Sequence, residues 1–221
     1  MGIADTVMVG QVGVIPLAAS SLVINLFHLP MVFGFGMLTS VSVLSANAFG
    51  ANDPLQVGRV YRASAVLTLA TSALLVVIFM AFRWMLPLLG QPPEVVDAAG
   101  AYLWFLAPSL LPMLVGLAGK QFCEALNHPW IPTLLMIGGV LLNILLNWML
   151  IYGNLGCPAM GLNGAGLATL LARIVTAAAM IAWLVRSKSL ARFRQGSWSG
   201  AGDLPVLRKL FKLGLPVSLQ H

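Results

Sequence analysis

The chain has 221 residues, of which 59% are hydrophobic and only 8% are charged, and its mean hydropathy is +0.93. Soluble domains carry about 25% charged residues, so this composition excludes a soluble globular protein and indicates a polytopic membrane protein. The net charge of +6 does not indicate a nucleic-acid partner, because seven of the twelve basic residues fall within residues 186–212, where they suit the anionic headgroups of membrane lipids.

The chain starts with an apolar run that carries one carboxylate, Asp5, and no cationic side chain precedes Arg59. An acid at the centre of a membrane helix costs about 2.5–3.5 kcal/mol on insertion scales, so a functional role is the first hypothesis for Asp5. The alternative is a solvated acid at an N-terminus, since Asp5 is only five residues from the start of the chain.

Five complete apolar spans follow, each long enough to cross about 30 Å of hydrocarbon. They cover approximately residues 17–47, 61–89, 97–122, 129–152 and 164–185. The breaks between the spans contain turn-forming Gly, Pro, Asn and Asp residues. The sequence therefore predicts a helical membrane protein.

The basic residues fix the orientation of these spans. Ten of the twelve lie in the alternate breaks at residues 48–62, 120–128 and 186–212, and the remaining breaks carry little or no positive charge. The positive-inside rule makes the basic side cytoplasmic. We expect a multi-pass protein of the plasma membrane, which in a bacterium is the inner membrane.

This orientation has a consequence for both ends of the chain. Residues 1–10 approach an external loop from the cytoplasm, yet ten helical residues rise only about 15 Å. We therefore expect an incomplete first helix in a longer protein. Residues 1–185 would form a transmembrane lobe of helices 1–6, residues 186–203 a cytoplasmic linker between lobes, and residues 204–221 the amphipathic start of a seventh helix.

The first full span contains Pro30, Gly34 and Gly36, followed by several hydroxyl residues. Proline and glycine loosen a transmembrane helix, and neighbouring hydroxyls can satisfy the freed carbonyls. These three positions predict a bending helix that lines a polar cavity. Ordinary packing of small residues is the alternative.

Three polar residues of the later spans are further candidates. Asn143 and Asn147 lie four residues apart on one helix face, which we expect to look into protein or water rather than lipid. Helix–helix hydrogen bonding is the alternative. Thr169 follows a run of small residues that suits close backbone approach, and bonding to its own helix is its alternative. Arg173, one turn further, could reach toward the surface or pair with an acid.

Nothing in the sequence predicts an enzyme. There is no HExxH, GxSxG or Walker A motif, and no glycine-rich dinucleotide-binding pattern. The two cysteines, Cys123 and Cys157, form no CxxC motif and fall on opposite sides of the predicted membrane, which indicates neither a disulfide nor a thiolate metal site.

Five segments in chain order resemble the multidrug and toxic compound extrusion (MATE) family of transporters. They are DTVMVG at 5–10 with LAA at 17–19, SANAFGA at 45–51 with Asp53, LNILLNWMLIYG at 142–153, GAGLAT at 164–169, and FKLGLP at 211–216. Each motif is weak alone, and the ordered set is fairly specific. The resemblance implies an all-α integral membrane antiporter of twelve helices in two six-helix lobes, of which this chain would be the N-terminal lobe with a truncated first helix.

The resemblance also implies a function. Such transporters export cationic amphipathic compounds by alternating access, coupled to entry of H⁺ or Na⁺, with no cofactor. The partners would be these small molecules, membrane lipids and a C-terminal lobe. The family's first-helix aspartate maps onto Asp5, and its other positions in the cation site map onto Asn143, Asn147 and Thr169. Some members carry a second aspartate at the position of Asn147, so the amide leaves Asp5 as the principal acid of the lobe.

Two other interpretations stay open. A flippase for lipid-linked saccharides has a related fold, but we would expect a cationic cavity there, and Arg173 is the one clear intramembrane cation. The chain could also be a non-functional fragment, because half of a transporter cannot alternate access alone.

Overall fold

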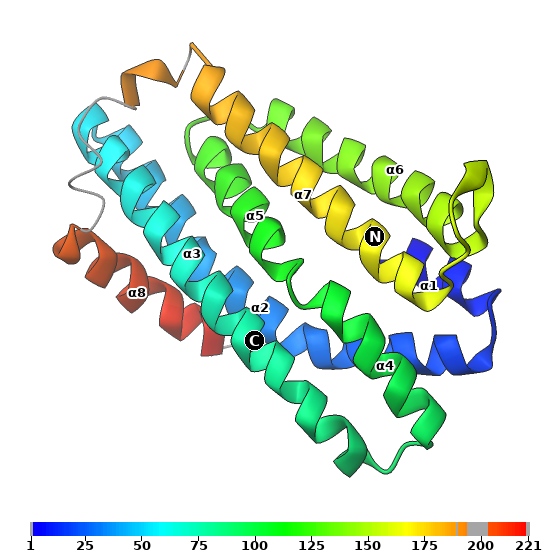
Figure 1. The fold of residues 1–221 in the computed structure, drawn as a ribbon. Helices are drawn as coiled ribbons and strands as arrows, with labels where there is room; N and C mark the ends of the chain where they lie inside the picture. Colours follow the sequence, from blue (N-terminus) through cyan, green and yellow to red (C-terminus); the bar gives the residue numbers. More distant parts are fainter. Residues whose placement is uncertain (1, 189, 194–202, 220–221) are drawn as a thin grey trace.

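The computed structural model describes residues 2–188, 190–193 and 203–219, and this part of the chain contains helices and no strand (Figure 1). The helices are α1 (Gly2–Gly10), α2 (Val14–Gly50), α3 (Pro54–Met85), α4 (Pro93–Leu106), α5 (Leu110–Ala125), α6 (Trp130–Tyr152), α7 (Leu162–Arg186) and α8 (Leu204–Leu219), with single turns η1 (Leu86–Leu89), η2 (Asn154–Gly156) and η3 (Ala191–Phe193). Four helices are long and apolar enough to cross a membrane, and the bent pair α4–α5 makes a fifth. The predicted all-α membrane fold is confirmed.

The connections between the helices lie at two opposite ends of the bundle (Figure 1). The α2–α3 and α5–α6 turns and the end of α7 share one end, and Arg59, Lys120 and Arg186 lie on or near these turns. We call this the cationic end. The α1–α2, α3–α4 and α6–α7 connections share the other end. The alternation that the positive-inside rule requires is therefore present in the fold.

The predicted division into a lobe, a linker and a seventh helix stays a prediction. Helix α7 ends at Arg186 and α8 begins at Leu204. Most of the predicted linker, at residues 189 and 194–202, lies outside the described residues, as do residues 220–221.

Local sequence determines where the helices begin and end. At the α2–α3 turn, the Asp53 side chain accepts a hydrogen bond from the backbone N–H of Gln56 at 2.9 Å, which satisfies one of the free N–H groups of the first turn. Pro54 follows at the first helical position, where a missing N–H costs nothing. Helix α6 ends at Gly153, whose φ of 75° suits glycine.

The third predicted span, residues 97–122, is bent rather than continuous. Helices α4 and α5 meet at an angle of 44°, with a break between Leu106 and Leu110. Pro108 lies in the break, and proline interrupts a helix because it lacks an N–H and clashes with the preceding turn. The Ser109 hydroxyl donates to the carbonyl of Leu106 at 2.6 Å. The break therefore has polar groups of its own inside the bundle.

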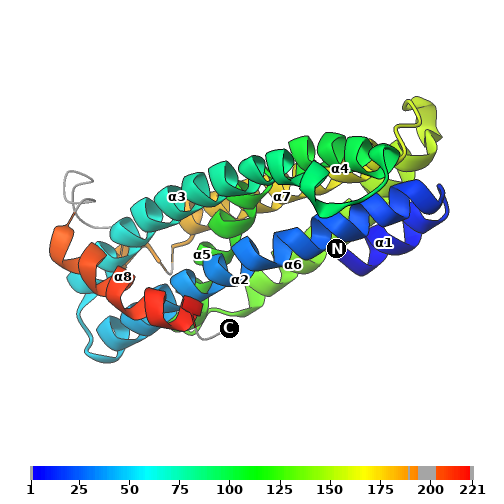
Figure 2. The same cartoon turned by 90° about the horizontal axis from the view of Figure 1, so that it is seen from below.

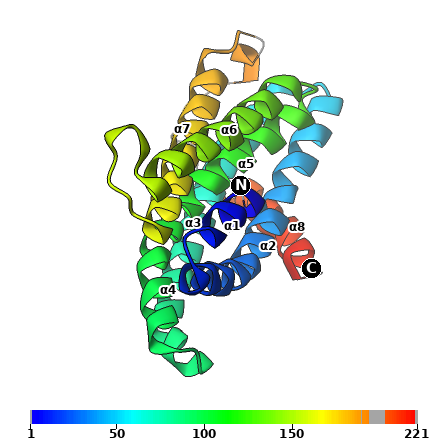
Figure 3. The same cartoon turned by 90° about the vertical axis from the view of Figure 1, so that its right-hand side faces the viewer.

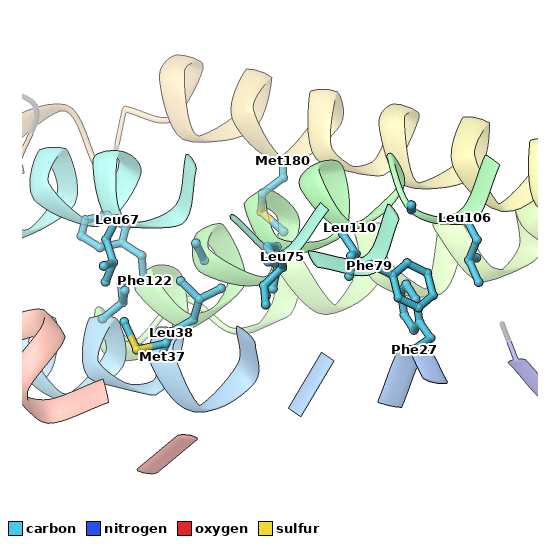
Figure 4. Packing of buried hydrophobic residues seen from close by; sticks show 14 of the residues in the cluster. Phe27, Met37, Leu38, Leu67, Leu75, Phe79, Leu106, Leu110, Phe122 and Met180 are labelled. Atoms are coloured by element: carbon cyan, nitrogen blue, oxygen red, sulfur yellow. The ribbon is translucent and has the colours of Figure 1, made fainter. Parts of the chain in front are cut away.

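A continuous apolar core joins α2 to α3, α4 and α5 (Figure 4). Phe27 of α2 and Phe79 of α3 meet edge to face with their ring centres 5.2 Å apart. At the cationic end α8 packs against α2 and α3, and at the opposite end α1 packs against α2 and α6 (Figure 2). Between helices in lipid, such packing supplies much of the stability, because the lipid tails are as apolar as the side chains.

Helices α6 and α7 approach each other at two glycines. A Cβ atom on Gly164 would lie 2.4 Å from the carbonyl oxygen of Leu150, and one on Gly139 would lie 2.2 Å from Oγ1 of Thr176. The predicted close backbone approach at residue 164 is present. The Gly164 contact lies where α6 ends and α7 begins, and the Gly139 contact lies near the middle of both helices, so the close approach extends from that end to the middle of the pair.

Gly138 and Gly139 allow a test of this contact, since no atom lies within 4 Å of a Cβ built on Gly138. We expect Gly139→Ala to lower the free energy of unfolding by about 1–3 kcal/mol through overpacking. Gly138→Ala should leave it unchanged or raise it by about 0.4–1 kcal/mol. Unfolding by SDS in mixed micelles measures both, and equal losses at the two positions would contradict this packing.

Candidate cation site

Helix α1 brings the Asp5 carboxylate into the bundle. This helix lies between α2 and α6 near one end of the molecule (Figure 3). It also contacts α7. Asp5 is only 5% exposed. The acid is therefore an interior group of the lobe, and the alternative of a solvated terminal residue is not what the structure has.

Two side chains, one from α6 and one from α7, donate hydrogen bonds to this carboxylate, and a third donates to one of them. Asn147 Nδ2 donates to Asp5 Oδ1 at 2.5 Å, and Thr169 Oγ1 donates to Asp5 Oδ2 at 3.5 Å. Asn143 Nδ2 donates to Thr169 Oγ1 at 3.3 Å. An ionised carboxylate is an acceptor only, so this arrangement of donors fits the charged form of Asp5.

The four residues predicted for cation coupling are thus in one place, although their role in coupling stays a prediction. Asn143, Asn147 and Thr169 are at most 1% exposed. The spacing of four residues puts both amides on the inner face of α6, and the small residues before Thr169 let α7 approach. The Asn143–Thr169 contact lies between the two glycine contacts of the same helix pair.

Two acceptors of the site have no donor. The side-chain oxygens of Asn143 and Asn147 are buried, and no described residue donates a hydrogen bond to them. Buried polar atoms are normally paired, so these two oxygens are exceptions in the interior of the bundle. Together with the Asp5 carboxylate and the Thr169 hydroxyl, they offer oxygen ligands of the kind that hard cations prefer, or an acceptor for the O–H of a protonated Asp5.

A second contact holds the outer end of α1. The Tyr152 hydroxyl, at the end of α6, lies 3.0 Å from the carbonyl oxygen of Met8 and 2.8 Å from Oε1 of Gln11. No sequence pattern indicates this contact, because Tyr152 and Gln11 are 141 residues apart and neither belongs to a run of polar residues. Helix α1 is therefore tied to α6 at two points, by Asp5 and by this hydroxyl.

The sequence leaves two alternatives for Arg173, which are reaching toward the surface and pairing with an acid. The guanidinium NH1 donates to Ser109 Oγ at 2.6 Å, and the guanidinium carbon lies 5.2 Å from the centre of the Phe27 ring. Arg173 is half-buried, and it lies on α7 one turn beyond Thr169. The bend between α4 and α5 is what brings Ser109 to it.

Pro30, Gly34 and Gly36 are not at the carboxylate. Helix α2 continues through Pro30. A Cβ on Gly34 would lie 2.7 Å from a methyl carbon of Leu114, and one on Gly36 would lie 2.4 Å from Cα of Ser218 on α8. Close packing of α2 is therefore present at both glycines, and a role of these residues in bending stays a prediction.

The chain is similar to known families and proteins over most of its length. The MatE family model matches residues 1–149. A protein described as probable multidrug resistance protein NorM from Mesorhizobium japonicum is 31% identical over 220 residues, which cover 99% of this chain and 47% of that protein. Its namesake in Bradyrhizobium diazoefficiens is 32% identical over 214 residues, covering 97% of this chain and 46% of that protein.

A solved structure has the same fold. It is an outward-facing multidrug resistance MATE family transporter of the MOP superfamily, which superimposes with a TM-score of 0.84 at 25% identity and covers 98% of this chain and 47% of that chain. The present chain spans about half the length of the curated relatives it matches.

The outer attachment of α1 can be tested apart from Asp5. Removing the hydroxyl in Tyr152→Phe should destabilise the attachment of α1 by about 0.5–1.5 kcal/mol. The free energy of local opening that amide hydrogen exchange reports for residues 8–12 should fall by about the same amount. The matched control is Asn154→Ala, which removes a bond to the Trp148 carbonyl at the same end of α6. If Tyr152→Phe and Asn154→Ala change the exchange rates in α1 equally, the Tyr152 hydroxyl does not attach this helix to α6.

Proposed function

The chain belongs to the MatE family of transporters, and we propose that it forms the N-terminal lobe of an antiporter that exports cationic amphipathic compounds. We further propose that export is coupled to entry of H⁺ or Na⁺ at Asp5, Asn143, Asn147 and Thr169. Names of relatives that refer to multidrug resistance support the substrate class. The family is one of transporters, which supports a protein without enzymatic activity.

One observation carries the coupling proposal. A buried carboxylate is met by donors from two other helices, while two amide oxygens beside it have no partner. A lone ionised group in a membrane interior is costly, and a proton or a small cation relieves that cost. The side-chain oxygens of Asn143 and Asn147, which accept no hydrogen bond from the described residues when Asp5 is ionised, are available to bind that proton or cation.

The hydrogen bonds give a mechanism for the coupling. When Asp5 is ionised, Asn147 and Thr169 donate to it and hold α1 against α6 and α7. A protonated carboxyl is itself a donor and a weaker acceptor, so the bonds from Asn147 and Thr169 weaken and the free oxygen of Asn143 or Asn147 can accept from the new O–H. A Na⁺ ion would draw the same oxygens inward. Either event changes the contacts that hold α1 and lets it repack, which alters the cavity open to the substrate.

A second lobe is part of the proposal. The relatives are about twice as long as this chain, and transporters built from repeats place substrate between two halves. The DNA that adjoins this reading frame tests this point. A second helical lobe encoded in frame supports the proposal, and unrelated sequence on both sides would leave the lobe without its partner.

Replacement of the carboxylate tests the coupling role. In the complete protein, Asp5→Asn should reduce ethidium efflux by at least about tenfold, since coupling free energies of 1–3 kcal/mol correspond to such factors. The amide keeps the shape of the side chain but cannot take up a charge. Efflux from cells, measured with and without a Na⁺ gradient and with a protonophore, also identifies the coupling ion.

The control for this variant is Asp53→Asn. Asp53 is an exposed carboxylate that caps α3, and asparagine caps helices equally well. This variant should transport at the unmodified rate. Efflux that keeps its rate and its pH dependence in Asp5→Asn would exclude Asp5 as the coupling residue.

A further inference from the structure

Arg173 is a cation within the helical bundle, and no carboxylate of the described residues bonds to it. Its guanidinium contacts the Ser109 hydroxyl and the Phe27 ring, and neither carries a negative charge. An arginine within a membrane is costly unless an opposite charge or water is near. The structure therefore raises the question of which group balances its charge.

Among the described residues, Asp5 is the one buried carboxylate, and it lies within electrostatic range of Arg173. The two are joined through Thr169, which bonds Asp5 and lies one turn before Arg173 on the same face of α7. The other titratable group that faces Arg173 is Tyr102 of α4, a buried phenol that is neutral at physiological pH. The α2 helix, the α4–α5 break and α6 face this region with an aromatic ring, a hydroxyl and amides, none of which is charged.

We propose that Arg173 is a built-in counter-cation that competes with transported cations for Asp5 and so sets how readily the lobe releases them. This inference rests on the proposed function, because it assumes that Asp5 holds the coupling ion or senses the substrate. Arg173 acts through the field at Asp5 and is a positioning residue rather than a ligand.

The sign of the effect follows from the charges of the two residues. With Asp5 ionised, the pair Asp5–Arg173 sums to zero, and with Asp5 protonated it sums to +1. Without Arg173 the corresponding sums are −1 and zero. In both protonation states a cationic substrate, Na⁺ or a proton is therefore held less tightly when Arg173 is present, and low dielectric strengthens this difference. Arg173 lowers affinity and speeds release.

Neutralising the residue in the complete protein tests this. Arg173→Gln should lower the KM for ethidium efflux by about tenfold, within the usual range of coupling between sites, and should also lower kcat because release becomes slower. The pH at which efflux is half-maximal should rise, since a proton is held more tightly too. Arg173→Lys keeps the charge and should keep KM within about twofold.

Arg83 provides a matched control. Its NH1 donates to the carbonyl of Gly100 at 3.2 Å, and its guanidinium carbon lies 5.8 Å from the centre of the Trp104 ring. It thus makes the same two kinds of contact as Arg173, but near the end of α3, and it does not act on Asp5. Arg83→Gln should leave KM and the pH profile unchanged, which separates loss of charge at the site from loss of an arginine contact.

Each outcome decides the inference. A KM that is unchanged or raised in Arg173→Gln overturns it, and so does Arg173→Lys behaving as Arg173→Gln does. Arg173→Met is a second neutral variant with the same expected result, and if both neutral variants fail to fold while Arg173→Lys folds, the residue is structural and the inference is wrong. Failure of the proposed function is distinguishable, because it appears as normal efflux in Asp5→Asn.

Discussion

A carboxylate buried among apolar helices has to be given hydrogen-bond donors, and much of this lobe is arranged to supply them to Asp5. The donors come from α6 and α7, which must therefore lie close together. Gly164 makes that approach possible at one end of the helix pair and Gly139 near its middle, and the Asn143–Thr169 bond lies between them. Packing in the α6–α7 contact and polar chemistry at Asp5 thus depend on the same backbone geometry. A side chain larger than glycine at either position would move the donors as well as the helices.

The same arrangement makes α1 the helix on which a change at Asp5 acts directly. Asp5 attaches it to α6 and α7, and the Tyr152 hydroxyl attaches it to the end of α6. A change in the charge of Asp5 alters the first of these attachments and leaves the second. Under the proposed function, the coupling ion therefore acts on the contacts of α1, and Arg173 limits how strongly any cation is held there.

Much of the fold and of the candidate site can be predicted from the sequence, and particular residues show which features cannot. Spans, turns and orientation follow from hydropathy and from the positions of lysine and arginine, and the spacing of Asn143 and Asn147 placed both amides on an inner face. The break at Pro108 falls within the predicted span 97–122, although proline is a recognised signal for an interrupted helix. Contacts between distant segments, such as Tyr152 with Gln11 or Arg173 with Ser109, had no sequence signal because they depend on how the helices pack.

The proposed coupling requires that Asp5 takes up a cation and that Asn147 responds to it. Infrared difference spectroscopy across an acid titration in lipid measures both events. We expect a carboxyl C=O band that appears on acidification, is absent in Asp5→Asn, and comes with a shift in an asparagine amide band that is lost in Asn147→Leu. Addition of Na⁺ should reduce the carboxyl band if the two cations share the site. A carboxyl band that persists unchanged in Asp5→Asn would show that Asp5 is not the group that takes up the proton.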